Sequence, residues 1–529
     1  MARVLVSDSL SKEGLEVLAK AEGIEHDYKP GLSEDDLVAA IPGYDGLVIR
    51  SGSKVTARVI AAADRLRVIG RAGIGVDNVD KEAASRRGII VMNTPTGNAV
   101  TTAEHALSLL FAVARKIGMA DATMKQGIWE KKKLQGRELT GKTLGVVGLG
   151  NIGRIVADRA LGLKMKVIGF DPVVTPERAA ELGVALVSLE ELFSSADAIT
   201  FHTPLTPATK GLINDANIAR MKKGVIIINA ARGAIVEEDA LVRGLNSGQV
   251  GGAGIDVFSQ EPCGLTELVK HPNVVATPHL GASTDEAQTR VAVEIAEQVV
   301  AYLTSGTITN SVNVPSVSRE MAPVLGPYAA LAARLGQFLG QIEKVAPRQI
   351  TVECIGDVAH LTVAPIVNAA LAGLLGRFFE EPVNGVNAPV LARDRGIEVR
   401  ELKGEVHAKY TTLVRVTLVG EGGAEVSAAG TLAADRTPRL VRWGRYEMDA
   451  HLEGTNLVVV NLDQPGVIGR IGTVLGEAGV NVSRMQMGLD TTTREAASLW
   501  ALDSEPDAAA LERIRESAGV KSVTCISLA

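Results

Sequence analysis

The stretch from Thr143 to Asp171 constrains the fold more strongly than any other part of the sequence. An apolar run that begins at Thr143 leads directly into the pattern Gly-x-Gly-x-x-Gly, and a second apolar run ends at Asp171. A strand, a tight turn, a helix and a second strand in this order form a dinucleotide-binding unit. Gly148 permits the turn, Gly150 lets the backbone approach a pyrophosphate, and Gly153 lets the helix pack against the strand. The free N–H groups at the start of the helix favour bound phosphates.

Asp171 indicates which dinucleotide this unit binds. A carboxylate at the end of the second strand accepts hydrogen bonds from both ribose hydroxyls and repels a 2′-phosphate. We therefore predict NAD rather than NADP as the cofactor. The glycine pattern alone is weak evidence in a chain with 55 glycines, and a merely structural turn is the alternative. The flanking apolar runs and Asp171 favour the nucleotide site.

Length and composition limit the remaining possibilities. A chain of 529 residues is too long for one hydrophobic core. Its net charge of −6 gives no general reason to expect nucleic acid or an anionic membrane as a partner, and no apolar run is long enough to span a membrane. The isolated cysteines Cys263, Cys354 and Cys525 fit neither a disulfide framework nor a zinc site. We expect a cytoplasmic protein without a bound metal.

The alternation of apolar and helical segments predicts an α/β protein with four domains. Residues 1–97 are typical of a flavodoxin-like α/β domain with a parallel sheet. A long helical pattern covers 98–117, with the capping-box spacing of Thr101 and Glu104 near its start, and a second capping box at Ser283 opens a helix expected to return to the first domain. The predicted domains are a discontinuous substrate-binding domain (1–97 and 283–318), an inserted Rossmann NAD-binding domain (98–282), an α+β intervening domain (319–453) and a βαββαβ domain (454–529). The strands expected in the first domain are Val4–Ser7, Gly46–Ile49, Arg67–Ile69 and Ile89–Met92.

Three polar residues follow apolar runs of the NAD-binding domain, where ligands bind in open parallel sheets. Arg232 suits bidentate binding of a substrate carboxylate, and His279 is of the residue type that exchanges protons near neutrality. Glu261 could hold the imidazole of His279 in one tautomer. Taken singly, each is more often a surface or loop residue than a catalytic one. Together they predict hydride transfer coupled to acid–base catalysis.

Several motifs in a fixed order identify a family for residues 1–315. This part of the chain resembles the NAD-dependent D-2-hydroxyacid dehydrogenases in the motifs Gly148–Gly153, His202–Thr206, Asn229–Ala234, Gly254–Val257 with Glu261–Pro262, and Thr277–Gly281. The resemblance implies that the arginine binds the substrate carboxylate, the histidine is the acid–base and the glutamate is its partner. The NAD contacts it implies are Gly148, Gly150, Asn151, Ile152, Gly153, Asp171, Thr203, Ala230, Ala231, Arg232, Asp256, His279 and Gly281.

Within that family, the extra C-terminal half and the motif Val48-Ile-Arg50-Ser51 resemble the long bacterial members that oxidise 3-phosphoglycerate in serine synthesis. The substrate-binding residues expected are Arg50, Ser51, Arg71, Gly73 and Gly75, together with Arg232 and His279. The alternative for Arg50 and Arg71 is a solvated surface charge. Members of this form are commonly homotetramers, which we expect here too. The rival interpretations are a dehydrogenase of another 2-hydroxy acid, such as 2-hydroxyglutarate, and a non-catalytic NAD-sensing protein similar to a corepressor.

The C-terminal segment carries a different signature. Asn461-Leu-Asp463-Gln-Pro-Gly466 resembles the strand–loop–helix start of an ACT domain, a regulatory amino-acid-binding module. The resemblance implies L-serine as an effector, and we nominate Asp463 and Asn481 to bind it; the alternatives are a helix cap, a turn residue, and a module that serves only for protein interaction. In the intervening domain, arginines recur every three residues and could bind an anion or form a solvated face: Arg436, Arg439, Arg442 and Arg445.

Overall fold

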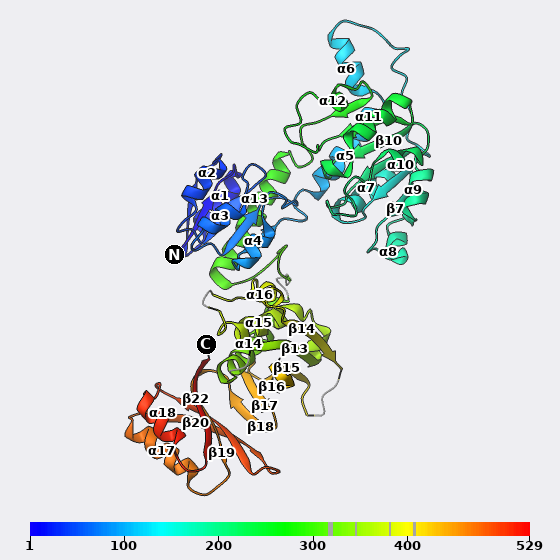
Figure 1. The fold of residues 1–529 in the computed structure, drawn as a ribbon. Coiled ribbons are helices and arrows are strands. Elements are labelled where there is room, and N and C mark those ends of the chain that lie inside the picture. The colour runs from blue at the N-terminus through cyan, green and yellow to red at the C-terminus, as the bar shows by residue number, and fades with distance from the viewer. Residues whose placement is uncertain (316–320, 344–345, 380–381, 406–408, 529) are drawn as a thin grey trace.

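The structure is a computed structural model that describes residues 1–315, 321–343, 346–379, 382–405 and 409–528. The described residues form four sheets, each with its own helices, and Figure 1 shows them in chain order from blue to red. The predicted boundary between 318 and 319 lies outside the described residues. No described helix is both long and apolar enough to cross a membrane.

The first sheet is parallel, with the strand order β2-β1-β3-β4-β5 expected of a flavodoxin-like fold. Sequence patterns missed β2 because Ile-Glu-His-Asp-Tyr is a mostly polar edge strand rather than an apolar run. The elements are β1 (Ala2–Val6), α1 (Lys12–Lys20), β2 (Ile24–Tyr28), α2 (Glu34–Ala40), β3 (Gly46–Ile49), α3 (Ala57–Ala62), β4 (Val68–Arg71), α4 (Lys81–Arg86) and β5 (Ile90–Asn93).

The second sheet has the order β12-β11-β10-β9-β6-β7-β8, and all its strands are parallel. The order reverses between β6 and β9, and ligands bind at the carboxyl ends of strands beside such a reversal. The doubly wound Rossmann fold is thus confirmed. The strands are β6 (Thr143–Val147), β7 (Lys166–Phe170), β8 (Ala185–Leu186), β9 (Ala198–Phe201), β10 (Val225–Asn229), β11 (Val250–Ile255) and β12 (Val274–Ala276). The helices are α7 (Asn151–Gly162), α8 (Pro176–Glu181), α9 (Leu189–Ser195), α10 (Asp215–Ala219), α11 (Glu238–Ser247) and α12 (Glu267–Lys270).

Two long helices connect the first two sheets. Helix α5 (Ala99–Ala114) enters the nucleotide unit, and α13 (Asp285–Ser305) returns to pack on the first sheet through Val291, Ile295 and Val299, so its ribbon lies among the blue strands of Figure 1. The predicted start of α5 at residue 98 is confirmed, since Asn98 precedes the first turn of this helix, and the capping-box spacing at Thr101 lies inside the helix. The predicted extension of this helix to residue 117 is wrong. A left-handed Lys116 separates α5 from α6 (Ile117–Lys125).

The third unit is an α+β structure with the sheet order β14-β13-β15-β16-β17-β18. Two helices, α14 and α15, pack closely against one another because Gly336 and Gly373 leave no room for a side chain at their crossing. The elements are α14 (Ala322–Ile342), β13 (Pro347–Gly356), α15 (Ala364–Leu375), α16 (Ala388–Asp394), β14 (Glu398–Gly404), β15 (Thr412–Gly420), β16 (Glu425–Leu432), β17 (Pro438–Trp443) and β18 (Tyr446–His451).

The C-terminal unit has the βαββαβ order that the sequence predicts, with an antiparallel sheet β20-β21-β19-β22. One face of this sheet is covered by its own helices, whereas Val458, Leu499 and Ile526 on the other face join the hydrophobic core of the third unit. The last two units therefore share a core. The elements are β19 (Gly454–Leu462), α17 (Val467–Glu477), β20 (Val482–Asp490), β21 (Glu495–Leu502), α18 (Ala508–Arg515) and β22 (Val520–Leu528).

Candidate active site

The predicted acid–base pair lies beyond the carboxyl ends of two neighbouring strands. Glu261 follows β11 and His279 follows β12, and Nδ1 of His279 is 2.7 Å from Oε2 of Glu261. An ionised carboxylate only accepts hydrogen bonds, so Nδ1 carries the proton. In the neutral imidazole this leaves Nε2 as a proton acceptor. Both side chains remain accessible to a ligand, with 52% and 38% of their surface exposed.

Arg232 lies beyond the end of β10 and reaches across to the first unit. Its Nε donates to Oδ2 of Asp77 at 2.7 Å, and its guanidinium lies so close to Gly75 that a Cβ there would collide with it. The first unit thus contributes backbone and a carboxylate beside the arginine. This brings together the three predicted catalytic residues at one edge of the sheet, with the Gly73–Gly75 loop opposite.

Arg71 faces this loop from the first sheet, and the guanidinium of Arg50 donates to the backbone carbonyl of Ser9 at 3.1 Å. Arg71 ends β4, and burial, together with the positive charges of Arg232 and Arg50, lowers its guanidinium pKa to about 10. Its Nε is buried without a hydrogen-bond partner among the described residues, and its Nη1 donates to the carbonyl of Ala72 at 3.1 Å. Because the positive charges of Arg232 and Arg50 act on Arg71, the three guanidinium groups form a site suited to a multiply charged anion.

Asp8 holds the loop that carries Arg50 and Ser51. One carboxylate oxygen of Asp8 accepts from the backbone N–H groups of Arg50 at 2.6 Å and Ser53 at 3.0 Å. Ser51 itself is exposed. The backbone of the predicted substrate loop is therefore fixed by a carboxylate that the sequence did not single out.

The turn after β6 fits a dinucleotide. Gly148 has φ 92° and its missing Cβ would touch the carbonyl of His202, while Gly153 lies directly on the carbonyl of Gly148. Space around Gly150 is open, and the first N–H groups of α7 have no side-chain cap. Oγ1 of Thr203 is buried without a partner among the described residues, which is what a ligand-binding hydroxyl shows in the absence of its ligand. The residues present fit the predicted NAD.

Further predicted NAD residues surround the same turn. The carboxylate of Asp171 accepts from the backbone N–H groups of Leu149 at 2.8 Å and Val173 at 2.9 Å, which shapes the glycine turn and leaves lone pairs for further donors. Asn151 donates to the carbonyl of Pro95 at 3.1 Å, across to the first unit. Ala230 and Ala231 are buried beyond β10, and Ile152 is half-buried in α7.

Asp256 is placed differently from a simple cofactor contact. Its carboxylate is buried under the loop of His279 and accepts from the N–H groups of Leu280 at 2.7 Å and Gly281 at 2.8 Å. Burial alone would raise the pKa of Asp256, but hydrogen bonds from His105, Thr277 and Leu280 hold it below its usual value. The structure therefore gives Asp256 and Gly281 a role in shaping the loop.

His202, in one of the motifs, is half-buried, and burial of its imidazole lowers its pKa to about 3. Its Nε2 lies 3.0 Å from Oγ1 of Thr200, while Nδ1 has no partner among the described residues. This imidazole stays neutral at physiological pH. It is therefore no substitute for His279 as a proton carrier.

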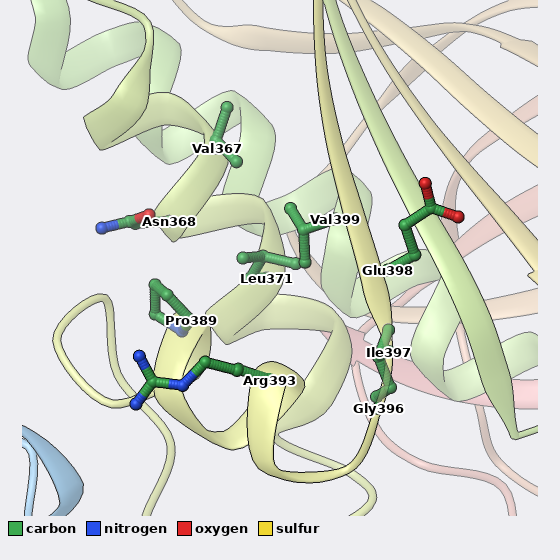
Figure 2. A pocket seen from close by; sticks show the side chains of 9 residues that line it. All are labelled: Val367, Asn368, Leu371, Pro389, Arg393, Gly396, Ile397, Glu398 and Val399. Carbon is green, nitrogen blue, oxygen red and sulfur yellow. The ribbon is translucent and has the colours of Figure 1, made fainter.

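A hollow elsewhere in the described residues contains none of the predicted site residues. It has a volume of about 450 Å³ and lies between α15, α16 and β14 (Figure 2). None of the residues predicted for catalysis, NAD or substrate lines it, and its one arginine, Arg393, is 68% exposed. Nor do the described residues contain any group of three or more His, Cys, Asp or Glu side chains placed to hold a metal ion.

The arginines spaced by three residues in the third unit do not form one free basic cluster. Nε of Arg439 donates to Asp449 at 2.7 Å, and Arg445 pairs with Asp490 and Glu495 of the C-terminal unit. The other two donate to backbone carbonyls: Arg436 and Arg442. Each guanidinium has its own acceptor, which argues against a shared anion site.

The two predicted effector residues lie at opposite ends of the C-terminal sheet, because β19 and β20 both run antiparallel to β21 and Asp463 follows β19 whereas Asn481 precedes β20. Asp463 is exposed in the loop between β19 and α17, and its N–H donates to the carbonyl of Arg494 at 2.9 Å. Asn481 is exposed before β20, and its N–H donates to Asp503 at 3.0 Å. Their backbones are fixed by the fold, and their side chains face solvent.

Comparison with known proteins matches three segments of the chain to family models. Residues 107–281 match the family model of the D-isomer specific 2-hydroxyacid dehydrogenase NAD-binding domain, residues 324–443 the D-3-phosphoglycerate dehydrogenase intervening domain, and residues 455–519 the ACT domain. The chain is 41% identical to D-3-phosphoglycerate dehydrogenase of Synechocystis sp. over 529 residues, covering all of this chain and 95% of the relative.

Two further matches agree with this. D-3-phosphoglycerate dehydrogenase of Mycobacterium leprae is 41% identical over 505 residues, which cover 95% of this chain and 94% of that protein. Among solved structures, a protein of Thermus thermophilus aligns with a TM-score of 0.54 at 38% identity, covering 59% of this chain and 99% of that one.

Proposed function

The chain belongs to the D-3-phosphoglycerate dehydrogenase family and is an NAD-dependent dehydrogenase, and we propose that it oxidises D-3-phosphoglycerate to 3-phosphohydroxypyruvate. The observation that carries the substrate assignment is the mutual proximity of Arg50, Arg71 and Arg232, with Arg232 beyond the same sheet edge as the His279–Glu261 pair. A substrate with a carboxylate and a phosphate needs several cations around a hydroxyl-bearing carbon, and this edge supplies them.

In the proposed mechanism Arg232 binds the substrate carboxylate through its guanidinium, and Arg71 and the Arg50–Ser51 loop bind the phosphate. Nε2 of His279 then faces the C2 hydroxyl and accepts its proton, while the hydrogen-bonded Glu261 stabilises the imidazolium. NAD supplies the acceptor for the hydride that leaves C2. One C–H and one O–H bond break, the C2=O double bond forms, and the proton remains on His279 until solvent removes it.

The residues proposed to hold NAD are those of the glycine turn and its surroundings. Gly148, Gly150 and the first N–H groups of α7 bind the pyrophosphate, and Asp171 accepts hydrogen bonds from the ribose. Thr203, with its unpaired buried hydroxyl, lies beside the turn and donates to the cofactor. Asn151, whose amide donates to the carbonyl of Pro95, joins the two units beside this turn.

The substrate assignment is tested by measuring NADH formation from 3-phosphoglycerate beside lactate, glycerate and 2-hydroxyglutarate. We expect the highest kcat/KM with 3-phosphoglycerate. Turnover of another acid without turnover of 3-phosphoglycerate would show that the substrate assignment is wrong and that the dehydrogenase reaction still holds. NAD binding with no turnover of any acid would instead indicate a nucleotide-sensing protein.

We further propose that L-serine binds where two copies of the C-terminal module meet, through Asp463 of one copy and Asn481 of the second copy, and inhibits the enzyme. An exposed carboxylate suits the ammonium group of serine, and the uncapped N-terminus of α17, next to Gly466, suits its carboxylate. Point substitutions are the sounder test, because deletion of the module would expose the core that it shares with the third unit.

Assembly as a homotetramer in the cytoplasm is also proposed. Exposed apolar side chains gather in and after α6, including Trp129 at 78% and Met124 at 53%, as expected of a surface that meets a second copy. The thiols of the chain are free, which suits a reducing compartment. Light scattering after size exclusion measures the subunit number directly, and a monomer at enzyme concentrations would contradict the assembly.

A further inference from the structure

Helix α5 packs against β11 with matched spacings. Viewed along the helix, Val113 and Leu109 are four residues apart, and they meet β11 at Gly252 and Gly254, which are two residues apart. A helix rises about 6 Å in four residues and a strand about 6.6 Å in two. Every fourth residue of α5 can therefore lie over every second residue of β11. A Cβ on either glycine would collide with the helix side chain above it.

Continuing the same spacings, four residues in α5 and two in β11, brings two polar residues together. Four residues before Leu109 is His105, and two residues after Gly254 is Asp256. Nε2 of His105 lies 3.1 Å from Oδ1 of Asp256 and also 3.1 Å from Oγ1 of Thr277. Thr277 is the residue after β12 and donates its hydroxyl proton to Oδ1 of Asp256 at 2.6 Å.

These partners fix the proton on His105. The carboxylate of Asp256 accepts only, and the single hydroxyl proton of Thr277 is already given to that carboxylate. Nε2 of His105 therefore meets acceptors alone and must carry a hydrogen. The imidazole is a donor to a carboxylate that is only 1% exposed.

Asp256 in turn shapes the loop of the catalytic histidine. Its carboxylate accepts from the N–H groups of Leu280 and Gly281, and its backbone carbonyl accepts from the N–H of His279 at 2.9 Å. His279 has φ 56°, in the left-handed region that is unfavourable for a non-glycine residue. Such a conformation persists only where surrounding bonds enforce it, and Asp256 supplies them on both sides.

We propose that His105 is a positioning residue for the dehydrogenase reaction, acting through Asp256 and Thr277 on the 277–281 loop. It anchors the carboxylate against the interdomain helix α5 and so holds His279 at the angle from which its Nδ1 meets Glu261. The inference rests on the proposed function for its kinetic test, but the geometry of the loop can be measured without any substrate.

The decisive comparison is between His105→Leu and His105→Gln. Leucine removes the donor, whereas the amide nitrogen of glutamine can occupy the place of Nε2. We expect His105→Leu to lower kcat by about 10–100-fold, as for a small misplacement of a catalytic group, with much smaller changes in both KM values. His105→Gln recovers most of the lost kcat. The control is Ser108→Ala on the same helix, whose hydroxyl donates only to the Glu104 carbonyl.

A double variant separates positioning from a general loss of structure. If His105 acts only through His279, then adding His105→Leu to His279→Ala lowers kcat no further. If His105→Leu instead lowers kcat by the same factor in the His279→Ala variant as in the wild type, the proposal is overturned. It is also overturned by a normal kcat in His105→Leu, or by a raised KM for NAD at unchanged kcat, which would make His105 part of the cofactor site.

Amide hydrogen exchange of the peptide around 277–284 keeps the test independent of the substrate assignment. We expect faster exchange at Leu280 and Gly281 in His105→Leu and near wild-type exchange in His105→Gln. If the wild type turns over no hydroxy acid, the proposed function fails while this measurement still decides on His105. If His105→Leu does not fold, His105→Asn, whose shorter amide falls short of Asp256, replaces it; unchanged exchange there would refute the inference.

Discussion

At the catalytic edge of the nucleotide sheet, His279 is held by side chains, whereas Asp463 and Asn481 of the C-terminal module project into solvent from a fixed backbone. The first region is a nearly complete site made by one chain, with its carboxylates and imidazole already paired. The second offers exposed polar groups at opposite ends of one sheet. We infer that catalysis depends on fixed geometry within the chain, and that the effector site gains its remaining contacts from the effector and from a second copy.

The largest effect is expected from removing the acid–base residue of the catalytic site. His279→Ala removes the acid–base and should lower kcat by about 10²–10⁴-fold in steady-state NADH assays. The control is His26→Ala in β2, on the edge of the first sheet. Near-normal turnover of the His279 variant would refute its role, and serine binding measured by calorimetry should be unchanged.

Substitution of Arg71 tests the anion-binding side of the catalytic site. Loss of a buried charge-assisted contact in Arg71→Met should raise KM for 3-phosphoglycerate by about 10–100-fold and leave KM for NAD nearly unchanged. Because the pKa of Arg71 in the free enzyme is lowered to about 10, wild-type affinity should fall as pH rises through that value and the guanidinium loses its proton. A substrate KM that stays flat as pH rises through that value would contradict this.

A smaller effect is expected at the effector surface. Asp463→Ala should raise the serine concentration for half-inhibition by about tenfold or more, as loss of a hydrogen bond to a charged group implies, with turnover in the absence of serine unchanged. Glu505→Gln, another exposed carboxylate of the module, is the matched control. Full serine inhibition of Asp463→Ala would remove this residue from the site.

The smallest effect concerns the ion pairs that join the C-terminal sheet to the third unit. The ammonium of Lys521 lowers the pKa of Glu495 against the opposing effect of burial, helped by Tyr446 and Arg445. Because the pKa of Glu495 is lowered in the folded protein, its ionised carboxylate stabilises the fold at pH values above its unfolded-state pKa. This stabilisation is lost as the pH falls through the folded-state pKa. Glu495→Gln should lower Tm by about 1–3 °C at pH 7, and its Tm should fall less steeply with acid. An equal acid dependence in both proteins would show that Glu495 contributes nothing.

The sequence predicted well those features that depend on local patterns. The glycine turn, Asp171 and the βαββαβ order of the C-terminal unit are short-range signals that physical rules decode directly. The capping box at Thr101 misled, because Thr101 lies inside α5 and Asn98 precedes the first turn. A local motif of this kind does not reveal whether a helix has already begun.

The remaining parts of the site depend on packing between distant segments. Asp77 meets Arg232 across 155 positions of the chain, and His105 meets Asp256 across 151. A signal for His105 did exist in the two spacings, four in α5 and two in β11, but it has meaning only once α5 is known to lie on β11. Asp77 had no such signal, since a lone aspartate in a loop is usually solvated.

The most direct test of the central claim follows the transferred atom. Purified enzyme is incubated with NAD and D-3-phosphoglycerate deuterated at C2, and the masses of both products are measured by mass spectrometry. The account predicts deuterium on the reduced nicotinamide together with 3-phosphohydroxypyruvate that has lost it. Reduced cofactor without deuterium, or no product of that mass, would contradict the account.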